Sequence, residues 1–476
     1  MEHHDFNAIQ SRRRFLQHSA CGLGSIALHQ LLAAEGRAGE AQPPAALRHL
    51  APRAKNVIFL FMAGAPSQLD LVSHKPVMAK YHGTPVPAEM LASLNDPLIK
   101  STASVFASPR TFSKYGASGM EFSDYLPHTA TVADELCMIH SMHTDVSNHD
   151  PAQLIMNCGV PRFGFPSMGS WVSYGLGSEC RDLPGFIVLT SDSGKGIDGG
   201  SANWANGFLP SEYRGVNFRN VGEPVLYLSN PAGVTRETQR ARLDAIGDLN
   251  RMHHAETGDA EIASRVAAYE MAFRMQLSAP DLLDFSTESE ATRALYGVEN
   301  ETTRPFGTNC LLARRMVEKG VRFVQLYHST WDDHSDLNVN LKINCDMTDQ
   351  PCAALIRDLK QRGMLDETLV IWGGEFGRTP MNEVRRGNTP GKEGRDHHPF
   401  SFSMWMAGGG VKSGAIIGET DELGYQVVRD PIHVHDLQAT ILHCLGVDHT
   451  KLTYRHQGRN YRLTDVAGNV VTQVLA

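Results

Sequence analysis

The sequence predicts an α/β fold, with a doubly wound, mostly parallel sheet that carries helices on both faces and a helical insertion. Two observations lead to this prediction. Short apolar runs alternate with helical patterns along the chain, as they do where crossover helices connect parallel strands. Several of the runs are followed directly by carboxylates and histidines, and open α/β sheets bind ligands at the carboxyl ends of their strands.

The first strand is predicted at residues 55–62, a continuous apolar run that ends at the turn of Gly64, Ala65 and Pro66. A run without polar alternation is typical of a parallel strand that is buried on both faces. Further strands are predicted at residues 135–140, 186–190, 321–327, 368–372 and 400–406.

Helices are predicted between these strands. A short one is expected at residues 152–156, and residues 351–363 carry apolar side chains at helical spacing. Asp436 is expected to cap a last helix that runs to Leu445. Residues 234–298 are rich in Ala, Arg, Glu and Met, which predicts a helical insertion packed on the sheet.

Composition narrows the class of protein. The chain has 476 residues, of which 42% are hydrophobic and 20% charged, the usual balance of a soluble globular protein. One large domain at residues 55–476 fits this length. The net charge of −8 and the lack of basic blocks argue against nucleic-acid binding. No two of the eight cysteines have Cys-x-x-Cys spacing, and whether Cys345 and Cys352 pair is left open.

The N-terminus predicts export. Residues 1–41 resemble a twin-arginine signal peptide, with Arg12 and Arg13 as the pair, and residues 42–54 read as a linker. The apolar stretch at residues 20–28 is too short for a stable membrane span. We therefore expect recognition by the twin-arginine translocation machinery and a periplasmic or extracellular location.

The chemistry is expected to lie past the late strands. Asp332 and His334 follow one strand and are two residues apart, so an extended segment can point both the same way. This mixture of oxygen and nitrogen donors suits a divalent metal; an acidic surface turn is the alternative. The alternation turns Asp333 away from the other two.

The next two segments add donors and cations. Glu375 follows a strand as a candidate ligand or general base. His397 and His398 stand together in a loop, where imidazoles are more often ligands or proton-transfer groups than core residues. Arg378 and Arg395, with Lys392, could hold an anionic ester, since charge-assisted hydrogen bonds to such oxygens are strong. A solvated basic patch is the alternative.

Six segments stand out together: residues 331–334 (WDDH), 374–380 (GEFGRTP), 394–397 (GRDH), 407–412 (AGGGVK), 433–437 (HVHDL) and 453–459 (TYRHQGR). On these segments the chain, from about residue 55 onward, resembles an exported bacterial family, domain of unknown function 1501. The family is considered similar to the sulfatase and alkaline phosphatase superfamily. That similarity implies a metal-bound site that hydrolyses sulfate or phosphate esters.

The superfamily pattern can be compared with this chain position by position. Asp332 and His334 match an Asp and a His of the superfamily in order, and His397 matches its last His. Glu375 stands where an Asp-His pair is expected, so that imidazole is missing. After the first strand, only Ser67 or Asp70 is near the place of the expected Asp.

The nucleophile departs most from the superfamily pattern. Residues 149–159 align with the segment in which sulfatases carry a nucleophilic Cys or Ser, and His149 stands at that position. Ser147 is the other nearby residue with a hydroxyl. His149 is therefore a hypothetical metal ligand, phosphate-accepting nucleophile or base; a hydrogen-bonding loop histidine is the alternative. Because a metal can activate water directly, hydrolysis without a covalent intermediate remains open.

The resemblance thus implies a metal-dependent hydrolase of sulfate or phosphate esters, with a sulfated carbohydrate as one candidate substrate. The expected metal is divalent (Zn, Ca, Mg or Mn), held by Asp332, His334, Glu375, His397 or His398, with Asp70 as a further candidate. The alternative is a sulfatase-like fold without catalysis, which serves as an exported binding or surface protein.

Overall fold

The computed structural model describes residues 49–476, apart from 89, 91–102, 192–195, 221 and 384–390. Leu47–Ala476 form one compact unit. The expected signal peptide, with Arg12 and Arg13, lies outside the described residues, as does most of the expected linker. No helix within the described part is both long and apolar enough to cross a bilayer.

One large mixed sheet confirms the predicted fold class. Among the described residues it has nine strands, in the order β14-β5-β13-β9-β1-β8-β6-β7, with β17 paired to β5. Only β13 runs antiparallel to its neighbours in this sheet. The strand bounds are β1 Asn56–Met62, β5 Leu136–His143, β6 Phe186–Ser191, β7 Val216–Phe218, β8 Phe323–His328, β9 Thr368–Gly373, β13 Phe402–Ala407, β14 Ala415–Ile417 and β17 Ile432–His433.

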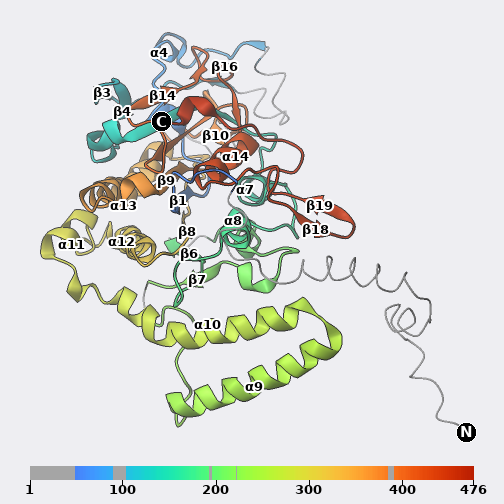
Figure 1. The fold of residues 1–476 in the computed structure, drawn as a ribbon. Helices are drawn as coiled ribbons and strands as arrows, with labels where there is room; N and C mark the ends of the chain where they lie inside the picture. The colour runs from blue at the N-terminus through green and yellow to red at the C-terminus, as the bar shows by residue number, and fades with distance from the viewer. Residues whose placement is uncertain (1–48, 89, 91–102, 192–195, 221, 384–390) are drawn as a thin grey trace, which may run out of the picture. The chain divides into compact units, whose positions relative to one another are not determined.

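Helices cover both faces of the sheet (Figure 1). Strand alternation sends Ile58 and Leu60 of β1 into one core and Phe59 and Phe61 into the other. The first core includes side chains of α10, α12 and α13, and the second those of α7, α8 and α14. Their bounds are α7 His149–Cys158, α8 Met168–Leu176, α10 Ala260–Leu283, α12 Arg304–Glu318, α13 Leu337–Gln361 and α14 Val434–Cys444.

The predicted helical insertion is present as α9 (Arg236–Thr257), α10 and α11 (Glu290–Tyr296). Both α9 and α10 begin at a capping side chain: Thr235 accepts a hydrogen bond from Thr238 N, and Asp259 accepts one from Glu261 N. The two helices form a hairpin in which α10 lies between α9 and the rest of the unit (Figure 1).

Three helix starts differ from the prediction. Helix α7 begins at His149, before Pro151, because proline is tolerated in a first turn. Helix α13 begins at Leu337 and carries Pro351 inside it. Helix α14 begins after His433, and Asp436 completes a capping box by accepting from His433 N rather than capping alone. The seven described cysteines are all unpaired, so Cys345 and Cys352 form no disulfide.

Short elements complete the region that surrounds the site. They are α3 Gln68–Leu71, α4 Met78–Tyr81, β2 Ser104–Val105, β3 Phe112–Tyr115, β4 Met120–Ser123, β10 Gly377–Arg378, β11 Met381–Asn382, β12 His397–His398, β15 Glu419–Thr420, β16 Val427–Arg429, β18 Tyr454–His456 and β19 Arg459–Tyr461. Pairing of β10 with β12 brings the segment after β9 back beside His397.

Candidate metal centre

Four segments far apart in sequence meet at the carboxyl ends of the central strands. Asp332 and His334 follow β8, Glu375 follows β9, His397 lies in β12, and His149 is the first residue of α7. The strand order places β9, β1 and β8 side by side and parallel, so their carboxyl ends share one edge of the sheet. The structure therefore brings these five predicted residues together.

Asp332 lies at the centre of the group. Its Oδ1 is 3.1 Å from His149 Nε2, 2.9 Å from His334 Nε2 and 3.2 Å from His397 Nε2. Arg378 Nη2 donates to the same oxygen over 2.8 Å. Three imidazoles therefore point the same ring atom at one carboxylate oxygen.

The opposite nitrogen of each imidazole is held by an acceptor. His149 Nδ1 donates to Glu375 Oε1 over 2.7 Å, and His397 Nδ1 donates to the carbonyl oxygen of Ser147 over 2.7 Å. His334 Nδ1 is hydrogen-bonded to Glu383 Oε2. Because Nδ1 donates its proton to these acceptors, Nε2 donates to Asp332 when a ring is protonated and offers its lone pair to the centre when the ring is neutral.

Burial and close contacts shift the pKa values of the residues in the cluster. Burial raises the pKa of Asp332, but hydrogen bonds from the three imidazoles outweigh it and hold this pKa well below its usual range. Burial lowers the pKa of His149, yet the nearby carboxylates of Asp332 and Glu375 raise it to about 9. Burial lowers the pKa of His397 to about 4.

The residues fit a divalent cation. Lone pairs facing a carboxylate repel one another unless protons or a metal ion lie between them. When the three imidazoles are neutral, as metal ligands are, the carboxylates of Asp332, Glu375 and Glu383 outnumber the guanidinium of Arg378 by two charges, the deficit that one divalent ion would neutralise. The ligand atoms of His149, Asp332, His334 and His397 all lie within 4.8 Å of one another. His149 Nε2 is buried and makes no hydrogen bond of acceptable geometry, and neither does Glu375 Oε2.

A backbone amide and a side-chain amide fix the carboxylate of Glu375. Gly64 N donates to Glu375 Oε1 over 2.9 Å, and Gln153 Nε2 donates to the same oxygen over 3.1 Å. Gly64 has a φ of +105°, and a Cβ there would lie 2.7 Å from Asp332 N. Glycine at this position therefore allows β1 to approach Asp332 closely.

Both arginines have roles other than the anion binding expected of them. Arg378 is fully buried and donates to the carbonyl oxygens of Gly64, Ala65 and Arg395 as well as to Asp332. Its guanidinium orients Asp332 and cannot also hold a substrate anion. The guanidinium of Arg395 is fully buried and forms an ion pair with Asp70.

Two candidate ligands lie outside the cluster. The Oδ2 of Asp70 is 2.7 Å from Arg395 Nε and accepts from Ser67 Oγ over 2.5 Å, so its carboxylate is already satisfied. His398 points away from the cluster because the two residues of β12 alternate, and its Nε2 donates to the carbonyl oxygen of Tyr425 over 2.6 Å. We therefore no longer expect either side chain to bind metal.

The sequence analysis missed Glu383 and Gln153. Glu383 N donates to the Gly394 carbonyl oxygen over 2.9 Å, which holds the Glu383 segment beside the His397 segment. His334, Glu383 and Asp396 also bring ligand atoms together, and they share His334 with the main cluster. Burial raises the pKa of Asp396 and raises that of Asp333 to about 7. No signal in residues 381–383 distinguishes Glu383 from a surface carboxylate.

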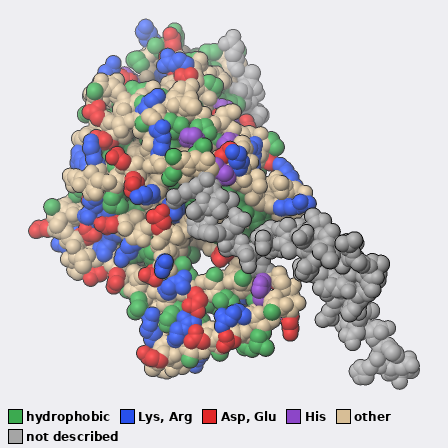
Figure 2. Space-filling view, viewed as in Figure 1, with side chains coloured by type: hydrophobic (Ala, Val, Ile, Leu, Met, Phe, Trp, Pro, Cys, Tyr) green, Lys and Arg blue, Asp and Glu red, His purple; other side chains and the backbone are tan. Residues whose placement is uncertain are grey.

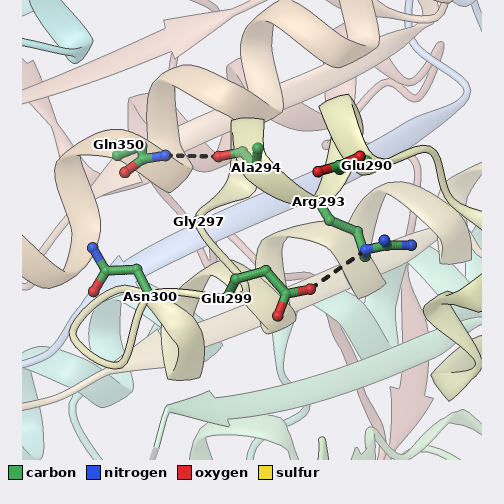
Figure 3. Close-up of a pocket in the computed structure, with 7 residues that line it drawn as sticks. All are labelled: Glu290, Arg293, Ala294, Gly297, Glu299, Asn300 and Gln350. Carbon is green, nitrogen blue, oxygen red and sulfur yellow. Dashed lines mark hydrogen bonds and ion pairs between the residues drawn. The ribbon is translucent and has the colours of Figure 1, made fainter.

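A separate hollow of about 470 Å³ lies beside α11 (Figure 3). Gln350 Nε2 donates to the Ala294 carbonyl oxygen over 3.0 Å, and Arg293 lies 3.4 Å from Glu299. Two pairs of its lining residues thus interact with each other, and none of the lining residues belongs to the cluster, so we assign this hollow no function. The lining residues are Glu290, Arg293, Ala294, Gly297, Glu299, Asn300 and Gln350.

Comparison with protein families gives one match, to the family described as "Protein of unknown function (DUF1501)", over residues 54–475. No curated protein matches the chain.

Solved structures are similar at low identity. A protein in the alkaline phosphatase superfamily from Vibrio parahaemolyticus is 11% identical with a TM-score of 0.35; the match covers 84% of this chain and 68% of the other. Alkaline phosphatase from the Antarctic bacterium TAB5 is 13% identical, with a TM-score of 0.31 and coverage of 78% and 96%. Ps i-CgsB in complex with k-i-k-neocarrahexaose is 10% identical, with a TM-score of 0.33 and coverage of 82% and 72%. Likeness at this level says nothing about the residues of the site.

Proposed function

The chain belongs to the DUF1501 family, and we propose that it is a metal-dependent hydrolase of sulfate or phosphate esters. One observation carries the proposal. Three imidazoles direct Nε2 at one oxygen of Asp332, while each Nδ1 is fixed by an acceptor. A carboxylate or carbonyl behind each ligating histidine is the arrangement that orients such ligands in metalloenzymes.

His149, His334, His397 and Asp332 would hold the metal. Three nitrogens and one oxygen favour a borderline ion such as Zn²⁺ over Ca²⁺ or Mg²⁺, which prefer oxygen ligands. A bound divalent ion supplies Lewis-acid activation of water and of the ester. His149 then serves as a ligand oriented by Glu375, rather than as a nucleophile.

The net charge of the site residues favours one class of anionic substrate. Arg378 and Arg395 are both buried and engaged, so neither guanidinium is available to a substrate. A divalent ion would bring the charge of Asp332, Glu375, Glu383 and Arg378 to about neutral. We therefore propose an ester with one negative charge, a sulfate monoester or a phosphodiester, in preference to a doubly charged phosphate monoester. A sulfated carbohydrate belongs to this class.

Export is also part of the proposal. The twin-arginine pattern at Arg12 and Arg13 supports transport of the folded chain to the periplasm or beyond. Cell fractionation of the full chain tests this: the Arg12→Lys/Arg13→Lys variant should stay in the cytoplasm, and unchanged export would refute it.

The second candidate function is that of an exported binding protein without catalysis. The engagement of Arg378 and Arg395 favours it, because a sulfatase-like reaction ordinarily needs cations that contact the ester.

Metal content and hydrolysis together separate the two functions. Purified protein should retain about one divalent ion per chain, and the metal-loaded protein should hydrolyse an aryl sulfate or a bis-aryl phosphate faster than an aryl phosphate monoester. Asp332→Ala should lose both metal and activity, whereas the exposed control Asp366→Ala should keep both. Metal without turnover of any ester would favour the binding protein, and no metal after repletion would contradict the metal-dependent hydrolase and also favour the binding protein.

A further inference from the structure

Helix α9 carries an apolar stripe that the described chain leaves uncovered. Ile246, Leu249 and Met252 are 40%, 65% and 66% exposed. The inner face of α9 is different: Leu243 and Gly247 are its buried residues, and they lie on the side of α10. Helix α9 is the outer helix of the hairpin (Figure 1), so its stripe faces away from the sheet.

Charged side chains bound this stripe at its two ends. Residues 242, 246, 249, 253 and 256 follow spacings of four and three, which places them on one face of a helix. Arg242 begins the stripe and Glu256 ends it, and both are exposed. Neither has an ion-pair partner among the described residues. The region of α9 and α10 in Figure 2 mixes hydrophobic, basic and acidic side chains.

These residues are arranged symmetrically about Leu249, so the stripe is complementary to an antiparallel copy of itself. Arg242 and Glu256 are each seven residues from Leu249, and Ile246 and Met252 are each three residues from it. In an antiparallel pair of α9 helices centred on Leu249, Arg242 would therefore face Glu256 of the other copy at both ends. Self-complementarity of this kind is what a two-fold symmetric interface requires.

We propose that two copies of the chain associate through α9, antiparallel and centred on Leu249. Ile246, Leu249 and Met252 supply the apolar contact, and the two Arg242–Glu256 pairs fix the direction and register. The stripe from Arg242 to Glu256 spans about 21 Å of helix. Such a contact is at the small end of interface sizes, so we expect a weak dimer that dissociates on dilution. The inference does not rest on the proposed hydrolase activity.

Charge exchange tests the pairing directly. The full chain should show a concentration-dependent monomer–dimer equilibrium in sedimentation experiments. Arg242→Glu places like charges opposite each other at both ends and should weaken the dimer about tenfold or more, which corresponds to about 1.4 kcal/mol. Arg242→Glu/Glu256→Arg restores opposite charges and should recover the dimer. The two single variants, Arg242→Glu and Glu256→Arg, should associate with each other more tightly than with themselves.

Matched variants keep the test specific. Arg265→Glu, an exposed charge reversal on α10, should leave the equilibrium unchanged, and Leu249→Asp should abolish dimerisation while the circular dichroism spectrum is preserved. The proposal is overturned if the native chain is monomeric at all concentrations, or if the double exchange fails to recover what the single reversal loses. Binding of the native chain to vesicles without self-association would also overturn it.

Discussion

His149 and Glu375 are joined by a hydrogen bond of 2.7 Å although 226 residues separate them. The contact ties the first residue of α7 to the segment that follows β9. Since Glu375 fixes the Nδ1 proton of His149, it decides which ring nitrogen faces Asp332. The orientation of one proposed ligand thus depends on a carboxylate that does not itself face the centre of the cluster.

Glu375→Gln should weaken metal binding without unfolding the protein. The amide keeps the size of the side chain and an oxygen that can accept from Gly64 N, but it removes the charge that favours His149 as a ligand. Loss of such a partner lowers metal affinity about 10- to 100-fold, which isothermal titration with Zn²⁺ would measure. Glu367→Gln, a surface change at the ion pair with Lys55, serves as the control. Equal affinities in both variants would contradict the role of Glu375.

Alanine substitutions at Gly64 and Gly83 distinguish the effect of backbone strain from the effect of steric crowding at the site. Gly64 and Gly83 both have positive φ angles, +105° and +77°, but a Cβ at Gly83 meets nothing within 4 Å while one at Gly64 lies 2.7 Å from Asp332 N. Both Gly→Ala variants should lose about 1 kcal/mol or more of stability from strain.

Only Gly64→Ala should also lose metal, because the added methyl displaces the backbone of Asp332. Zn²⁺ titration and urea unfolding of the two variants provide the comparison. If Gly83→Ala impaired metal binding as much as Gly64→Ala, the close approach of Gly64 to Asp332 would not matter for the site.

Sequence patterns predict the strands of the sheet well because burial on both faces requires continuous apolar runs, as in residues 55–62. They do not predict that β13 runs antiparallel to its neighbours, because the pattern of apolar residues in a strand does not depend on the direction in which the strand pairs. Asp332, His334, Glu375 and His397 could be placed near one another because each follows a strand or a turn at the same edge.

Other parts of the site depend on contacts that the sequence does not encode locally. The guanidinium groups of Arg378 and Arg395 bind acceptors that are far away in the sequence: backbone carbonyl oxygens for Arg378 and the carboxylate of Asp70 for Arg395. An arginine that binds an anion and one that orients a carboxylate are the same residue type in the same loop, so only tertiary structure separates them. Glu383 was missed for the same reason.

Asp70→Asn should destabilise the protein strongly at neutral pH. Asp70 and Arg395 are both fully buried, with 2.7 Å between Oδ2 and Nε, and removing one partner of a buried ion pair costs about 3 to 5 kcal/mol. Burial raises the pKa of Asp70, but the charge and hydrogen bonds of Arg395 outweigh it and lower this pKa in the folded state. The pair therefore contributes fully above about pH 4, and its contribution is lost as the pH falls through the lowered pKa.

Urea unfolding at pH 7, 5 and 3 tests this dependence. The difference between the native protein and Asp70→Asn should be the same at pH 7 and 5 and smaller at pH 3. A difference that stays constant down to pH 3 would mean that Asp70 does not act through its charge.

His328 should make the protein less stable in mild acid. This last residue of β8 is fully buried, with its ring packed against Phe306 and Trp331. Burial lowers its pKa to about 4, although the nearby side chain of Asn344 opposes this shift. Between pH 6.5 and 4 the unfolded chain binds a proton that the folded one does not, so the free energy of unfolding should fall by up to about 3 kcal/mol. His328→Leu should remove this part of the pH dependence in urea unfolding from pH 7 to 4, whereas His82→Gln, at an exposed histidine, should leave it unchanged. An unaltered slope in His328→Leu would show that the pKa of His328 is the same in the folded and unfolded states, so that burial does not lower it.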